Sequence, residues 1–509
     1  MHRCLSILDV VSMIATCLGE GFRGQPKKDL LAMAMTCRSF VAPALDALWQ
    51  NQSSLKPLLS TLPESLVGIR FESHKMVFYS RRYATVPDDW TRFQLYAPRI
   101  KKFQFYGEVI DPGLFFILKA YRPSNLLRNL SAIYWSPICP IDIFLGPSLS
   151  TICFTGTQST PETFSVSVPT LAPQLRSLEC YVMMSPNEGP ALTNLISNLY
   201  RLEQVTIMSF VSASAIAHLA SLSSIREASF NFSGEEVDPD VICSLLPNPS
   251  FSALRKLRVH VDELSLLARI LPHMHGAPLR SLHITATETP TAANMRDLLV
   301  AVATTFSATL QSLRIDDEEE DYPGNLEGRI ITDDILSPAL GLSNLTEFII
   351  NMGMSLDISL PFVQELAKSW TKLKRLDLSK LYPLGDAPNL SIEAFVPLAK
   401  FCPNLVDIAI HVDARHDRVP HHGPGGVSNH SVKSICADSC AIDQAPPVAA
   451  FLASLFPSLE TVFSHDGGFD DDDDDDDDDP NSPDATWGEV RRLFPVFDAV
   501  RDQGEEEGR

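Results

Sequence analysis

The stretch "TKLKRLDLSK", Thr371–Lys380, places leucines at Leu373, Leu376 and Leu378 in the pattern L-x-x-L-x-L. The same spacing of apolar residues recurs upstream in "APLRSLHITA" and downstream in "CPNLVDIAIH". The last two apolar residues of each copy alternate with polar ones, which is the two-residue period of a strand with one buried face. Each copy therefore predicts one β-strand.

This apolar pattern occurs fourteen times along the chain, at intervals of 19 to 35 residues. The first apolar residue of each copy is, in order, Ile100, Leu130, Leu149, Leu175, Leu202, Ile225, Leu254, Leu279, Leu310, Leu345, Leu373, Leu405, Val432 and Leu459. Helical stretches such as "SIEAFVPLAKF" (391–401) separate the copies, with apolar residues three and four positions apart.

One strand and one helix in every twenty to thirty-five residues is the unit of a leucine-rich-repeat solenoid. A single unit cannot bury its leucines, so stacked units bury them together in one continuous core. We therefore predict an α/β solenoid over residues 96–465, with a curved parallel sheet and helices on the convex side. The alternative is an ordinary α/β domain, which the regular spacing disfavours.

Composition excludes some partners and compartments. The net charge is −22, and ten of the acidic residues form one run, Asp470–Asp479. Such a polyanion should bind neither nucleic acid nor anionic membranes, because both require clustered cations. The ten cysteines lack C-x-x-C pairs, and no apolar run is long enough to span a membrane. We expect a soluble protein of the cytoplasm or nucleus.

Residues 1–50 lie outside the repeat pattern and predict three short helices. "HRCLSILDVVSMIATCL" should bury Val10, Val11, Ile14 and Leu18. A second helix should start at the Asp29 cap, and a third should start at Pro43. The number of apolar residues predicts a small bundle that exposes an apolar face to a partner.

These residues resemble an F-box, in the form that precedes degenerate leucine-rich repeats in fungal proteins. The resemblance rests on "LSILDVVSMI", on "LLAMAMTCRSFVAPALDALW" and on the segment "DDWTRFQLYAPRIKKF", which is similar to the linker of those proteins. It implies that the helices bind a Skp-family adaptor and, through it, a cullin. The residues that the resemblance assigns to this contact are Leu5, Leu8, Val11, Ile14, Leu18, Cys37 and Phe40. The alternative is a plain helical cap on the solenoid.

The resulting organisation has five parts. They are an F-box-like module (1–50), a linker or cap (51–95), the solenoid (96–465), an acidic disordered linker (466–483) and a C-terminal helix with an acidic tail (484–509). The run "DDEEED" (316–321) should likewise be a loop.

The solenoid also predicts which side chains form its exposed concave surface. If the first, fourth and sixth positions of a unit point inward, the third, fifth and seventh face the concave side. Arg258, His283 and Arg314 then form one row at the fifth position, beside His260 at the seventh. We interpret this basic row as a recognition surface for an acidic or phosphorylated substrate segment, because arginine binds such groups bidentately. The alternative is an ordinary solvated face.

The sequence contains no catalytic, nucleotide-binding or zinc-protease motif, and no cofactor site is expected. Histidines and cysteines gather in the segment 411–440, but its Gly/Pro-rich composition favours a solvent-exposed insertion over a metal site. These residues are His411, His416, His421, His422, His430, Cys436 and Cys440. The sequence therefore favours a non-catalytic substrate-recognition subunit of a cullin-type ubiquitin ligase. The alternatives are a leucine-rich-repeat interaction scaffold and an enzyme with an unrecognised site.

Overall fold

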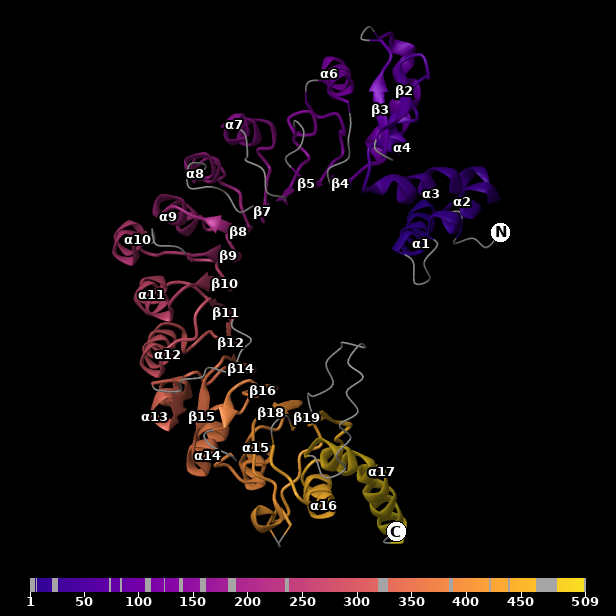
Figure 1. Ribbon diagram of the computed structural model, residues 1–509. Helices are drawn as coiled ribbons and strands as arrows, with labels where there is room; N and C mark the ends of the chain where they lie inside the picture. The colour runs from indigo at the N-terminus through magenta and orange to yellow at the C-terminus, as the bar shows by residue number, and fades with distance from the viewer. Residues whose placement is uncertain are drawn as a thin grey trace. The chain divides into compact units, whose positions relative to one another are not determined.

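A computed structural model defines the fold (Figure 1). It describes residues 5, 7–20, 26–72, 75–82, 85–105, 111–122, 124–136, 141–155, 162–181, 189–233, 238–318, 328–383, 388–420, 423–437, 440–463 and 483–507. The chain divides into two compact units, Met1–Ile225 (unit 1) and Arg226–Arg509 (unit 2).

Unit 1 begins with three helices, α1 (Leu8–Glu20), α2 (Pro26–Thr36) and α3 (Arg38–Gln50), each of which contacts the other two. Their shared core consists of Val11, Ala15, Leu30, Met33 and Ala44. The apolar residues of α1 that reach this core are spaced four apart, so one stripe of the helix is buried.

Two predicted helix starts in this module are wrong. Helix α2 begins at Pro26, so Asp29 lies in its first turn and is not its cap. Helix α3 begins at Arg38 and contains Pro43, because the chain becomes extended at Cys37 (φ −159°, ψ 161°) and separates α2 from α3 there. The segment "CRSF" (37–40) therefore forms the start of α3, and α2 ends before it at Thr36.

The rest of unit 1 is built of repeats. Its parallel strands, in spatial order, are β1 (Asn51–Gln52), β4 (Lys102–Phe105), β5 (Ala132–Trp135), β6 (Thr151–Phe154), β7 (Ser177–Cys180) and β8 (Gln204–Phe210). Its α-helices are α4 (Lys56–Leu59), α5 (Thr91–Tyr96), α6 (Pro112–Tyr121), α7 (Glu162–Leu171), α8 (Gly189–Ser197) and α9 (Ala213–Ser221). An antiparallel hairpin, β2 (Val67–Glu72) and β3 (Lys75–Ser80), and the 3-10 turns Pro87–Trp90 and Ala97–Arg99 complete the described elements.

Unit 2 continues the same repeat. Its main sheet is parallel and contains, in order, β9 (Glu227–Asn231), β10 (Lys256–Val261), β11 (Ser281–Ala286), β12 (Ser312–Asp317), β14 (Glu347–Asn351), β16 (Arg375–Asp377), β18 (Asp407–Ala409), β19 (Ser434–Cys436) and β20 (Thr461–Phe463). A second parallel sheet contains β13 (Ile330–Thr332), β15 (Ser355–Asp357) and β17 (Tyr382–Pro383).

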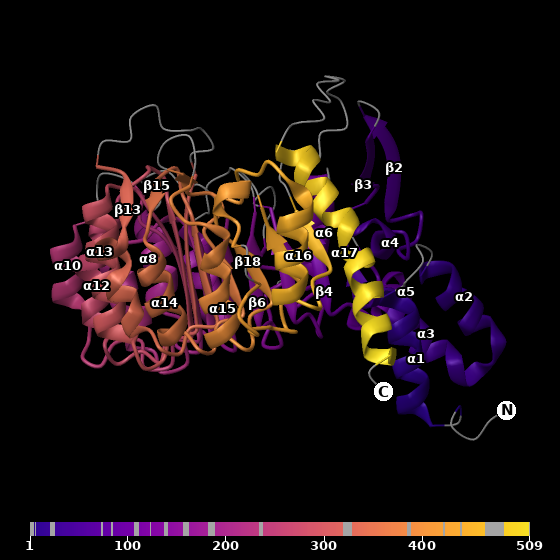
Figure 2. The same ribbon diagram turned by 90° about the horizontal axis from the view of Figure 1, so that it is seen from below.

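The helices of unit 2 form one layer on one side of the main sheet (Figures 1 and 2). They are α10 (Pro239–Leu245), α11 (Leu264–Ile270), α12 (Ala292–Phe306), α13 (Asp333–Leu336), α14 (Leu360–Ser369), α15 (Phe395–Phe401), α16 (Ala445–Leu455) and α17 (Pro483–Glu507). The 3-10 turns are Leu271–Met274, Ser337–Gly341, Ile392–Ala394 and His416–Arg418.

The strand register confirms the predicted leucine-rich-repeat fold. Each strand from β4 onward in the main sheets begins two residues after the first apolar residue of its sequence copy. The fourth positions pair across neighbouring strands, as in Leu257↔Leu282↔Leu313, and these three side chains are at most 3% exposed. Each unit is thus a leucine-rich-repeat solenoid whose core lies between the sheet and the helices.

The C-terminal helix α17 covers the last repeat of unit 2. Trp487, Val490 and Phe494 are buried, and the Trp487 Nε1 donates a hydrogen bond of 3.0 Å to the carbonyl of Cys440. The helix begins at Pro483, one residue before the predicted boundary. The Asp470–Asp479 run lies outside the described residues.

Replacing Leu282 with Ala should remove about 2–5 kcal/mol from the free energy of unfolding, because this side chain is fully buried between stacked repeats. Ser281→Ala, on the other face of the same strand, is the matched control and should change the free energy by less than about 0.5 kcal/mol. Urea denaturation of both variants provides the comparison. Equal stability of the two variants would contradict the assigned register.

Candidate functional site

One face of the main sheet of unit 2 is covered by none of the described helices (Figure 1). We call it the inner face; it carries the third, fifth and seventh positions of each repeat. The fifth positions of β9 to β12 pair in register as Ser229↔Arg258↔His283↔Arg314, and we call this set the central row. The predicted alignment of Arg258, His283 and Arg314 is therefore correct. Their role in binding stays a prediction.

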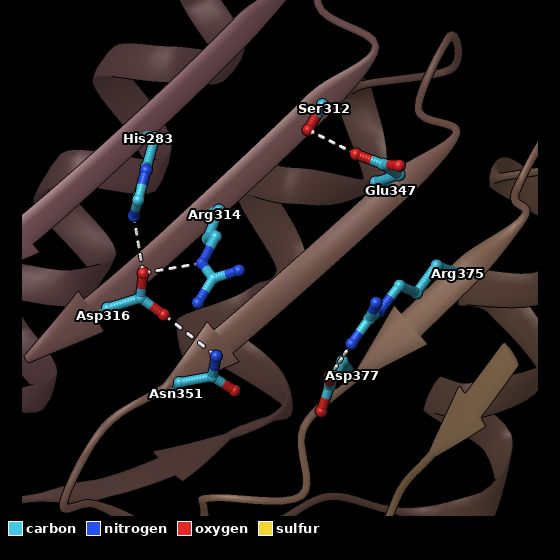
Figure 3. Close-up of polar contacts among 8 residues, drawn as sticks. All are labelled: His283, Ser312, Arg314, Asp316, Glu347, Asn351, Arg375 and Asp377. Carbon is cyan, nitrogen blue, oxygen red and sulfur yellow. Dashed lines mark hydrogen bonds and ion pairs between the residues drawn. The ribbon is translucent and has the colours of Figure 1, made fainter. Parts of the chain in front are cut away.

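Asp316, at the seventh position of β12, organises one end of the central row (Figure 3). Its Oδ2 atom lies 2.6 Å from the Nε2 of His283 and 2.6 Å from the Nε of Arg314. Its Oδ1 atom accepts a hydrogen bond of 2.9 Å from the side-chain amide of Asn351 on β14. One carboxylate thus ties three neighbouring strands together.

The pKa of Asp316 reflects two opposing effects. Burial of the carboxyl favours the neutral form, but the hydrogen bonds from His283, Arg314 and Asn351 outweigh it and lower the pKa to about 2. The carboxylate is therefore ionised throughout the neutral range, and it holds Arg314 in a fixed orientation.

Two of the three side chains in the predicted basic row consequently have an acidic partner within the protein, which the sequence did not indicate. His283 and Arg314 are both engaged by Asp316. Arg258 differs: its side chain is exposed, and no ion pair or hydrogen bond of its guanidinium is found within the described residues. His260 lies beside the row with its Nδ1 3.7 Å from a carboxylate oxygen of Glu318.

Other charges on the inner face are paired locally. Lys256 lies 3.1 Å from Glu227, and Arg375 donates to Asp377 at 2.8 Å. The hydroxyl of Ser312 donates to Glu347 at 2.8 Å (Figure 3). Sequence analysis did not identify these pairs or the role of Asp316. The sequence does contain a signal for them. Acidic side chains and basic or hydroxyl side chains occupy the third, fifth and seventh positions of the same copy or of neighbouring copies. The predicted loop at 316–321 is also wrong at its start, because Asp316 and Asp317 belong to β12.

The histidine-rich segment is not simply a solvent-exposed insertion. His411 is 4% exposed and its Nε2 lies 2.7 Å from the carbonyl of Ser379. Asp413 is 1% exposed and receives hydrogen bonds of 2.9 and 2.7 Å from Arg415. Both residues are buried because this segment continues the repeats through bridges of single residue pairs. His421 and His422 lie outside the described residues.

No group of three or more His, Cys, Asp or Glu residues suited to a metal ion is found in the described part of the chain. Nor does any described helix combine the length and apolar character needed to cross a membrane. The helix layer of unit 2 contains a groove of about 630 Å³ between α14 and α15. Its polar lining comes from Gln364, Glu393 and Lys400, amid mostly apolar and proline side chains.

The residues predicted for adaptor binding differ in their exposure. Val11 is 2% exposed and belongs to the core of the helical module, with Leu18 and Phe40 packed against it. Val11 is thus a core residue, as the sequence predicts, and its contact with a partner stays a prediction. Leu8 and Ile14 are 64% and 38% exposed.

The remaining two assigned residues, Leu5 and Cys37, precede α1 and α3. Leu5 is half-buried. The Cys37 Sγ lies 3.0 Å from the Ser39 hydroxyl, and this hydrogen bond lowers the pKa of the thiol.

The exposed apolar surface of this module is larger than the sequence indicated. We use the name helical apolar face for the set of exposed apolar side chains on α1–α3 and just before α1, which are Ile7, Leu8, Met13, Ile14, Leu31, Met35 and Val41. Sequence reasoning missed Met13, Leu31 and Met35, because periodicity alone did not show which stripe of each helix is buried.

Comparison with known proteins yields no matching family model, and no curated protein matches the sequence. Solved structures of leucine-rich-repeat proteins are similar in fold. A structure of the Drosophila Toll–Spatzle complex matches with 12% identity and a TM-score of 0.39, covering 77% of this chain and 54% of that one. This chain therefore spans about half the length of that relative.

Two bacterial structures also match. A leucine-rich-repeat protein of Leptospira interrogans shows 12% identity and a TM-score of 0.34, with 67% of this chain and 91% of that chain covered. The leucine-rich-repeat protein LegL7 of Legionella pneumophila shows 13% identity and a TM-score of 0.30, with 53% and 90% covered. The fold assignment itself rests on the strand order and register given above.

The Asp316 network leads to a pH-dependent prediction. Because its folded-state pKa is below the ordinary value of 3.8, its contribution to stability is present above about pH 4 and is lost as the pH falls towards 2. Asp316→Asn should lower the free energy of unfolding by about 1–3 kcal/mol at pH 7. The difference from wild type should narrow below pH 4.

The matched control is Glu347→Gln, which removes an exposed inner-face carboxylate. It should change stability by less than about 1 kcal/mol. Urea titrations of the three proteins at pH 7, 4 and 3 provide the measurement. A constant difference between wild type and Asp316→Asn across that range would contradict the assignment.

Proposed function

We propose that this chain is a non-catalytic substrate-recognition subunit of a cullin-type ubiquitin ligase. In this proposal, α1–α3 dock on a Skp-family adaptor and the repeats hold a protein substrate. The observation that carries the proposal is the helical apolar face, which lies outside the core of its own module. The F-box resemblance of residues 1–50 supplies the class of partner.

The exposure of this face is large for a module of its size. Leu8, Met13, Leu31 and Met35 are 64%, 68%, 55% and 80% exposed. Several large apolar side chains exposed on a module of about fifty residues are typical of a protein-binding site. Methionine suits such a surface, because its flexible side chain adapts to a partner.

The connection between the helices and the repeats of unit 1 also supports an adaptor role. Helix α3 leads directly into β1, and the carbonyl of Gln50 accepts a hydrogen bond of 2.9 Å from the amide of Lys101. The rings of Trp49 and Tyr96 stack with centroids 4.6 Å apart. A partner bound to the helices would therefore be held in a defined orientation to the first repeats.

The second candidate function is a leucine-rich-repeat interaction scaffold unconnected to ubiquitin. The same attachment of α3 to β1 favours it, because a helical module at this position also caps the exposed end of a solenoid. The two functions differ in the partner of the helical apolar face.

The test is binding of a purified Skp-family adaptor to the full-length chain. Leu8→Asp combined with Met13→Asp places two charges on the helical apolar face and should weaken adaptor binding at least about tenfold, because the complex would bury them unpaired. The matched control is Val166→Asp on α7, where the replaced side chain is also 64% exposed. It should bind as wild type does.

Biolayer interferometry with immobilised adaptor gives the affinities, and circular dichroism verifies that the variants are folded. Absence of adaptor binding by the wild type, together with capture of other proteins through the repeats, would favour the scaffold. Equal loss of binding in the control and the double variant would contradict the assigned face.

A further inference from the structure

We propose that the inner face of unit 2 binds an acidic segment of a partner protein, with Arg258 and Arg314 each holding one carboxylate. This inference rests on the proposed role of the repeats as the substrate-binding part. It goes further by naming the chemistry of the segment and the two residues that recognise it.

Arg258 is the first anchor. The other inner-face cations of this region have acidic partners, as Lys256 has in Glu227 and Arg375 has in Asp377. Arg258 is exposed, and the described residues offer its guanidinium no such partner. Directly opposite Arg258 on β9 lies Ser229, which is 5% exposed and whose hydroxyl has no hydrogen-bond partner among the described atoms.

An unpaired hydroxyl in a buried position is costly, since the lost hydrogen bonds to water are not replaced. A carboxylate that docks on Arg258 from the inner face would provide an acceptor beside Ser229. The free guanidinium and the unpartnered hydroxyl are two separate observations that indicate the same kind of ligand.

Arg314 is the second anchor. Its Nε is occupied by Asp316, at 2.6 Å, and its Nη atoms have no hydrogen bond within the described region. Asp316 also contacts His283 and Asn351, so its carboxylate is fixed in place (Figure 3). It contacts the Arg314 guanidinium only at the Nε edge. The remaining Nη atoms can donate to an incoming carboxylate in fixed geometry, which limits the entropy lost on binding.

The spacing of the two arginines fits an extended peptide. Arg258 and Arg314 lie on strands separated by β11, so their backbones are about 9.6 Å apart, or two interstrand spacings. In a peptide with polyproline II geometry, which has three residues per turn and a rise of about 3.1 Å, side chains three positions apart lie on the same side of the chain, about 9 Å apart. A segment that crosses the strands can thus place one acidic side chain at each arginine.

The surrounding charges favour acid over base in the ligand. Glu227, Asp316, Glu347 and Asp377 all contact donors of the protein itself. A basic segment would be repelled by Arg258. It would also have to displace the protein's own donors from these carboxylates. The contacts of Asp316 also show that His283 and Arg314 of the central row can bind a carboxylate.

The experiment uses the full-length chain and a fluorescein-labelled peptide with Glu at every third position and Gly or Ser between. Fluorescence anisotropy should show saturable binding by the wild type that weakens as salt rises. Arg258→Glu combined with Arg314→Glu should weaken binding at least about tenfold. The matched control combines Arg255→Glu with Arg280→Glu, which changes the net charge equally at exposed second positions of two repeats. It should remain within about twofold of wild type.

Arg258→Gln combined with Arg314→Gln removes both charges without adding repulsion near Asp316. It replaces the Glu pair if thermal melting shows that the Glu pair is unfolded. Adaptor binding should be unchanged in all these variants, whereas Leu8→Asp with Met13→Asp should leave peptide binding intact. The two proposals can therefore fail independently.

Three results of these experiments would overturn the inference, and a fourth comes from a phosphorylated peptide. The three are absence of saturable binding by the wild type, equal loss in the control pair, and equally tight binding of a peptide with Lys in place of Glu. A phosphoserine peptide of the same spacing that binds while the Glu peptide does not would also overturn it, because the ligand group would then be phosphate.

Discussion

Burial of three apolar positions in every repeat is the constraint on which the rest of the structure depends. In the repeat that contains β11 these positions are Leu279, Leu282 and Ile284, and none of their side chains is exposed. One repeat cannot hide them alone, so the strands must stack in register. This register also determines that the third, fifth and seventh positions face away from the core, because successive side chains of a strand point to opposite faces.

The chemistry of the inner face follows from this register. Side chains at the fifth and seventh positions of neighbouring strands come within hydrogen-bonding distance, as His283 and Asp316 do. Most charges there pair with one another, and such pairs fix orientation more than they add stability. Arg258, for which the described residues provide no charge partner, differs in this respect and is the starting point of the proposed ligand site. The helical apolar face consists of apolar side chains, so the two proposed binding surfaces differ in chemistry.

The long-range repeat could be predicted from sequence because its signal recurs, and each predicted copy places a strand two residues later. Short elements without alternation could not be predicted, including β1 and the second sheet of β13, β15 and β17. The central row was predictable from position, whereas the pairing of His283 and Arg314 with Asp316 depends on side-chain directions between repeats. The burial of Val11 could be predicted from its place in an apolar stripe, whereas its contact with a partner could not be decided, because in a small bundle such a stripe can be core or interface.

Hydroxyl-radical footprinting of the folded chain, read residue by residue by mass spectrometry, tests the central claim most directly. Along β11 the account predicts rapid oxidation of His283, with Leu282 and Ile284 protected until the chain is unfolded in urea. Oxidation of Leu282 and Ile284 in the folded chain, at rates similar to that of His283, would contradict the register and the inner face built on it.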